Sequence, residues 1–101
     1  MKIIDNFETK NVERQNVIVE TSRNYSNGRT CIQIMSTRGA PLMVASVNLP
    51  DDDLPDGHVF IKDYSENEGV ADALVKAGFI EPTDVVINQG FVSIRMYKLL
   101  I

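Results

Sequence analysis

Four aspartates precede the single histidine of the chain in the segment NLPDDDLPDGHVF (residues 48–60). This composition could bind a divalent cation, support acid–base catalysis with His58, or form a solvated acidic turn. A calcium-binding EF-hand loop counted from Asp51 fails, because position 5 is Pro55 and position 6, where glycine is required, is Asp56. The aspartates therefore predict an acidic loop and no metal site.

Cysteine chemistry is the second option, because the chain has one cysteine, Cys31, beside its one histidine. Zinc sites need three or four ligands, more than this pair supplies. A Cys31–His58 thiolate pair oriented by Asp56 or Asp63 would be catalytic, but no pattern brings the two residues together. Motifs of the G-x-S-x-G, P-loop and G-x-G-x-x-G types are missing from the sequence. We therefore expect no catalytic residues, no metal and no cofactor, and a protein that is not an enzyme.

Charge is distributed unevenly along the chain. Residues 1–40 carry six Lys/Arg and four Asp/Glu, a balance of +2, whereas residues 41–101 carry four and ten, a balance of −6. All ten of the later carboxylates lie between Asp51 and Asp84. A negative field repels nucleic acid phosphates and attracts basic surfaces.

Length and composition indicate one soluble domain over residues 1–101, with 44% apolar and 24% charged residues. The apolar runs are too short to span a membrane. The start, MKIIDNFETK, lacks the apolar core of a signal peptide, and one cysteine cannot form an internal disulfide. We expect the protein in the cytoplasm of the host cell.

A β-hairpin is the clearest local signal, over about residues 16–37. Asn27-Gly28 favours a type I′ turn, which would place Val19 opposite Ser36 and Arg23 opposite Ile32. The predicted core face of this hairpin consists of Val17, Val19, Tyr25, Ile32 and Ile34.

Further strands follow a turn at Gly39: one over residues 42–49, one in HVFIKDY, and two near the C-terminus in DVVI and FVSIRMYKLLI. Ser65 and Glu68 have the spacing of a capping box for a helix of about three turns that ends at Gly78. The sum is an α+β fold, a mostly antiparallel sheet of five or six strands with one α-helix packed on it.

Four segments, NYSNGRTCIQIM, SVNLP, VFIKDYSENEGVADALVKAGFI and QGFVSIRMYKL, together resemble a family of short uncharacterised proteins encoded by phages and conjugative elements. The resemblance carries no catalytic motif and no site residues. It implies an accessory or anti-defence role, a class to which inhibitors of CRISPR effectors belong.

Charge and resemblance together suggest a protein that binds and modulates a host protein with a basic surface, such as a defence nuclease. Carboxylates would then take the place of phosphates in the basic groove of the partner. The candidate partner-binding residues are Asp51, Asp52, Asp53, Asp56, Asp63, Glu66, Glu68 and Asp72.

Two alternatives remain open. The chain could have a structural role as a homodimer, in which an edge strand such as the final one pairs with its copy. It could instead bind nucleic acid directly through basic residues interleaved with acids, which are Lys10, Arg14, Arg23, Arg29 and Arg38.

Overall fold

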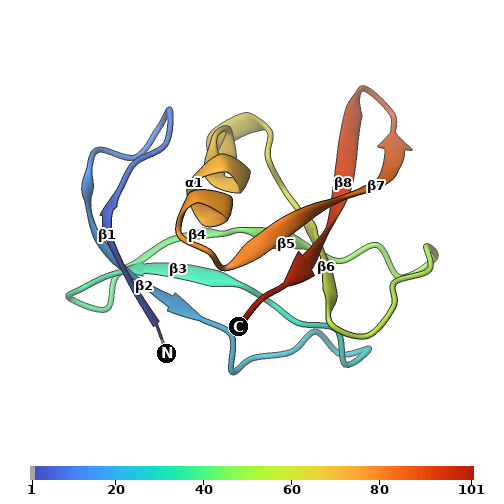
Figure 1. Cartoon of the computed structure of the whole chain (residues 1–101), viewed down its shortest axis with the longest axis horizontal. Helices are drawn as coiled ribbons and strands as arrows, with labels where there is room; N and C mark the ends of the chain where they lie inside the picture. Colours follow the sequence, from blue (N-terminus) through green and yellow to red (C-terminus); the bar gives the residue numbers. More distant parts are fainter. Residues whose placement is uncertain (1) are drawn as a thin grey trace.

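The computed structural model describes residues 2–101, which form one α-helix and two antiparallel sheets of four strands (Figure 1). The first sheet has the order β1-β2-β3-β4, with strands Lys2–Phe7, Gln15–Glu20, Gln33–Ser36 and Pro41–Val44. The second has the order β5-β6-β8-β7, in which β5 is Ser46–Val47, β6 is His58–Ile61, β7 is Ile80–Gln89 and β8 is Val92–Leu99. A 3-10 turn, Ser65–Asn67, precedes α1, Val70–Lys76.

The predicted α+β class, the antiparallel pairing and the single α-helix are confirmed. The prediction of one sheet of five or six strands is wrong, because the strand expected over residues 42–49 changes partner in its middle. Ala45 donates its N–H to Ile32 O at 2.8 Å and accepts from Lys62 N at 2.8 Å. The chain thus leaves β3 on one side and joins β6 on the other, which divides the strands between two sheets.

The hairpin around Asn27-Gly28 is confirmed, but its turn is not the expected type I′. Tyr25 N donates to Arg29 O at 2.8 Å, and of the two central residues only Gly28 has positive φ, +85°. This is the three-residue loop in which a glycine forms a bulge.

The loop shifts the pairing by one residue, because Thr30 lies opposite Asn24 and not Tyr25. The shift has grown to two residues between β2 and β3, where Val19 lies opposite Ile34 and not Ser36. A shift of two residues leaves each side chain on its original face. Val17, Val19, Ile32 and Ile34 are buried as predicted, and Tyr25 is half-buried.

The start of α1 is also built differently from the prediction. Ser65 does not cap the helix; it lies in the 3-10 turn with φ +53°. Asp63 supplies the cap instead, since its Oδ1 accepts from the N–H groups of Gly69 at 2.9 Å and Ala71 at 3.2 Å. The helix is seven residues long, shorter than expected, and Gly78 follows it with φ +78° as predicted. No helix within residues 2–101 is long and apolar enough to cross a membrane.

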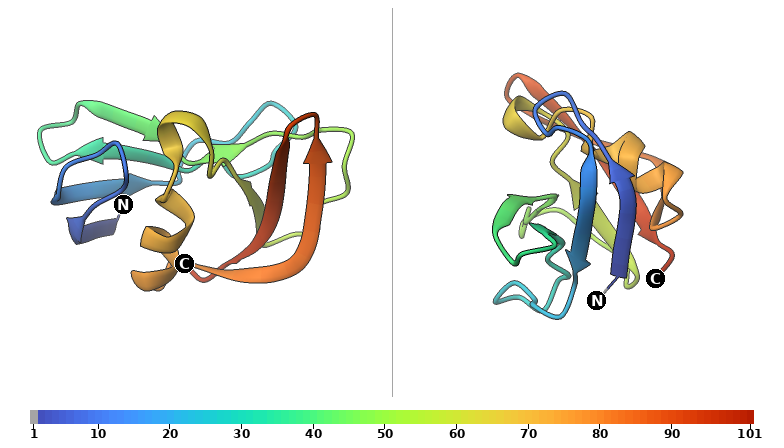
Figure 2. Two further views of the ribbon diagram at one scale, coloured as in Figure 1. Left: turned by 90° about the horizontal axis from the view of Figure 1, so that it is seen from above. Right: turned by 90° about the vertical axis from the view of Figure 1, so that its left-hand side faces the viewer.

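Two apolar clusters hold the elements together. The larger cluster lies between the sheets and α1. Figure 2 shows this helix beside the long, arched β7–β8 hairpin. The larger cluster contains Phe7 from β1, Ile34 from β3 and Leu74 from α1. The smaller lies on the other face of the second sheet, around Phe60 and Ile94. Both faces of β6 are therefore covered, and three of its four residues are buried in succession.

The final strand is not an edge, because β8 lies between β6 and β7. The suggestion that it pairs with a second copy is therefore wrong for this strand. The edges of this sheet are β5 and β7, and β7 contains Pro82 and a bulge between Pro82 and Val86. Proline and bulges are features that hinder pairing between exposed edges.

Candidate partner-binding surface

The acidic segment, residues 49–56, is a loop between β5 and β6 that is fixed at both ends; we call it the acidic loop. Leu49 and Leu54 pack against the smaller apolar cluster and so flank the three consecutive aspartates. Asp52 N donates to Leu49 O at 3.1 Å, and His58 N donates to Pro55 O at 3.3 Å in the closing turn. The predicted turn at Asp56-Gly57 is confirmed, with φ +77° at the glycine.

Arg29 holds the acidic loop against the first hairpin. Its Nη1 donates to Leu49 O and its Nη2 to Asp52 O, both at 2.7 Å and in partly buried positions. Both contacts are to backbone carbonyls, so the guanidinium fixes the path of the chain and leaves the carboxylates of the loop free. A planar fork with two parallel donors suits this role better than a lysine ammonium would.

The four aspartates of the loop face outward to different extents. Asp51, Asp53 and Asp56 are exposed and Asp52 is half-buried. None of the four belongs to a salt bridge among residues 2–101. The loop is thus a fixed backbone with unpaired negative charge, an arrangement that costs little ordering entropy when a partner binds.

The other four predicted residues lie on the segment that leads into α1 and in the first turn of this helix, and most have partners within the chain. Asp63 caps the helix. Lys62 donates to Glu66 at 2.6 Å and lowers the pKa of that carboxyl below its ordinary range. Lys10 pairs with Glu68 at 2.7 Å, and Glu68 raises the pKa of Lys10. Asp72 is exposed in the first turn of α1.

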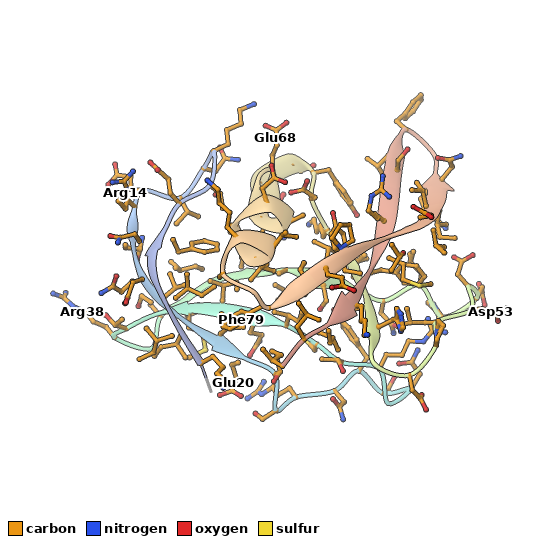
Figure 3. The ribbon with its side chains drawn as sticks, viewed as in Figure 1. Arg14, Glu20, Arg38, Asp53, Glu68 and Phe79 are labelled. Atoms are coloured by element: carbon orange, nitrogen blue, oxygen red, sulfur yellow. The ribbon has the colours of Figure 1, made fainter. Side chains whose placement is uncertain are left out.

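The eight predicted residues therefore form two groups and not one surface. Figure 3 shows Asp53 at one end of the longest axis and Glu68 on the upper side, with Arg38 at the end opposite to Asp53. Because only the acidic loop carries several unpaired carboxylates close together, it is the stronger candidate of the two groups.

The residues considered for catalysis have structural contacts. His58 Nδ1 lies 3.0 Å from Asp56 O, within the closing turn of the acidic loop. Half-buried Cys31 lies beside Tyr25, whose hydroxyl is 2.9 Å from Ser46 Oγ; burial raises the pKa of Tyr25. Within residues 2–101, no group of three or more His, Cys, Asp or Glu side chains is arranged to hold a metal ion.

The basic residues considered for nucleic acid binding are partly occupied. Lys10 and Arg14 pair with Glu68 and Glu8, and Arg29 is bonded to the acidic loop. Three of the five cations therefore have their charge or their donors directed at the protein itself.

Arg29 is the important residue that the sequence patterns missed, since they group it with the other cations. Two features of the sequence point to Arg29. It follows the Asn27-Gly28 turn directly, and the backbone carbonyls of the acidic loop have no hydrogen-bond donors from a neighbouring strand. The sequence does not show that the fold brings this hairpin and the acidic loop together.

No family model, curated protein or solved structure matches this chain.

Proposed function

We propose that the chain is a non-enzymatic accessory protein of a mobile element that binds a host protein with a basic surface and modulates it. A nuclease that acts in host defence is the partner class that best fits a protein presenting carboxylates where phosphates would otherwise bind. The observation that carries the proposal is the acidic loop, whose path is fixed by Arg29, Leu49 and Leu54 while its aspartates remain unpaired.

The chemistry of this loop accounts for the kind of partner. Unpaired, closely spaced carboxylates attract cations over roughly 8–10 Å at physiological ionic strength and accelerate association with a basic groove. Fixed carboxylates are acceptors for arginine and lysine donors, and charge-assisted hydrogen bonds of this kind are the strong ones.

The test compares three immobilised forms of the protein in host lysate. The loop variant changes Asp51, Asp53 and Asp56 to asparagine, which keeps size and removes three charges. The matched control changes Asp5, Glu8 and Glu13 to their amides, which removes the same charge from the N-terminal region. A host protein held by the native form and the control, but lost by the loop variant, supports the proposal.

A host protein that the loop variant retains as well as the native form does would contradict it. A shared loss in both variants would mean that total charge, and not the acidic loop, attracts the partner. Glu8 pairs with Arg14 at 3.3 Å on the surface, and such exposed pairs contribute about 0–1 kcal/mol, so the control is expected to fold.

A further inference from the structure

Phe91 is a large apolar side chain fully exposed to solvent at the tip of the β7–β8 hairpin. Gln89 pairs with Val92, so the hairpin closes through a two-residue loop, Gly90-Phe91. Gly90 has φ +61° and supplies the conformation that the first position of such a turn requires. The turn therefore does not depend on an aromatic residue at its second position. Packing within the chain does not explain the aromatic side chain of Phe91 either, because it is fully exposed.

The tip lies at the same end of the molecule as the acidic loop. Gln89 lines a hollow of about 160 Å³ together with Leu49, Pro50, Asp51 and Asp52. On the other side of the turn, Val92 packs against the same small cluster as Leu49 and Leu54. Both residues that flank the Gly90-Phe91 turn are thus tied to the acidic loop or its anchors.

The size of this end permits one partner to cover both features. The molecule measures 35 × 27 × 21 Å, and the β7–β8 tip and the acidic loop lie toward one end of the longest axis (Figure 1). A standard interface buries about 800 Å² on each partner. The 27 × 21 Å cross-section is of the same order as that area, so one partner of ordinary size can cover the tip and the loop together.

We propose that Phe91 and the acidic loop form one docking surface, in which Phe91 enters an apolar pocket bordered by arginine or lysine on the partner. This inference rests on the proposed function and adds the apolar anchor to it. Interface centres are enriched in aromatic residues and their rims are polar. Charge favours a basic protein over a lipid surface, because anionic membranes and unpaired aspartates repel each other.

Two synthetic peptides test the surface without knowledge of the partner. Each has four arginines, placed around two glycines in one peptide and around two leucines in the other. They are titrated at low salt into the ¹⁵N-labelled native protein, a Phe91→Ser variant and an Ile3→Ser control. Ile3 is also an exposed apolar residue but belongs to β1 in the other sheet.

The native protein and the Ile3→Ser control are expected to bind the leucine peptide about tenfold more tightly than the glycine peptide, with amide shifts at Gly90 as well as in the acidic loop. Phe91→Ser should abolish that difference and keep the affinity for the glycine peptide. An undiminished preference for leucine in Phe91→Ser would overturn the inference while leaving the proposed function intact.

Other outcomes separate the remaining possibilities. If neither peptide shifts the amides of the acidic loop, both the inference and the proposed function fail. If the native protein self-associates in light scattering and Phe91→Ser does not, the occupant of the surface is a second copy, and the basic partner is refuted. Binding of Phe91 to neutral phosphatidylcholine vesicles, with neither peptide preferred, would likewise overturn it.

Discussion

Replacement of Arg29 should release the acidic loop from the body of the protein. Its guanidinium makes two hydrogen bonds of 2.7 Å to Leu49 O and Asp52 O. Hydrogen bonds to charged groups contribute about 1.5–3 kcal/mol each, but both carbonyls are only partly buried and can turn to water. We therefore expect Arg29→Ala to lower the free energy of unfolding by about 2 kcal/mol, and Arg29→Lys by about 1 kcal/mol, because one ammonium cannot bond both carbonyls.

Urea unfolding and amide hydrogen exchange measure this effect globally and locally. For a domain of this size, 2 kcal/mol corresponds to a melting temperature lower by about 10 °C. The N–H of Asp52, which donates to Leu49 O within the loop, should exchange faster in both variants. Arg38→Ala is the control, since Arg38 is exposed at the opposite end and surface substitutions change stability by about 0.5 kcal/mol or less. Equal stability and equal exchange in Arg29→Ala and Arg38→Ala would refute the role given to Arg29.

Three other predictions concern the fold around this surface. Asp63→Ala should lower the free energy of unfolding by about 1 kcal/mol by removing the cap of α1, whereas Ser65→Ala should leave thermal stability nearly unchanged. A larger loss of stability in Ser65→Ala than in Asp63→Ala would mean that Ser65 is the cap. Gly69→Ala should destabilise by about 1–2 kcal/mol, because φ is +97° and the added Cβ would lie 3.4 Å from Lys10 N; an unchanged urea midpoint would contradict this. Burial raises the pKa of Tyr25 and Tyr97 above their ordinary value of 10. The contribution that these protonated hydroxyls make to stability is therefore fully present below pH 10 and is lost as pH rises through the folded pKa values. Tyrosinate absorbance should therefore rise together with unfolding, and a Tyr25→Phe variant that unfolds at the same alkaline pH as the native protein would count against it.

Local signals predicted the elements whose cause is local. Three of these elements are confirmed, and each depends on a few neighbouring residues. They are the hairpin at Asn27-Gly28, the acidic loop and the end of α1 at Gly78. The first strand was missed because Ile4 and Phe7, its buried residues, are three apart, which is not the alternation of a regular strand. A bulge between them, with Asn6 at φ +57°, accounts for that spacing.

Long-range pairing explains the remaining differences. Whether residues 42–49 form one strand or two depends on the partners of Ala45, and these lie at Ile32 and Lys62. Ser65 has the right spacing for a cap, yet the carboxylate of Asp63 accepts the hydrogen bonds from the amides of Gly69 and Ala71. The acidic loop was predicted from composition. To predict the role of Arg29 and the exposure of Phe91, one would need the strand pairing of the two hairpins that carry them.

The most direct test of the central claim measures the affinity of the purified host partner for the native protein and for the loop variant, with and without duplex DNA. If aspartates occupy a basic groove, the native protein should bind, DNA should compete with it, and the loop variant should lose most of its affinity. Equal affinity of the two forms, unaffected by DNA, would contradict the claim.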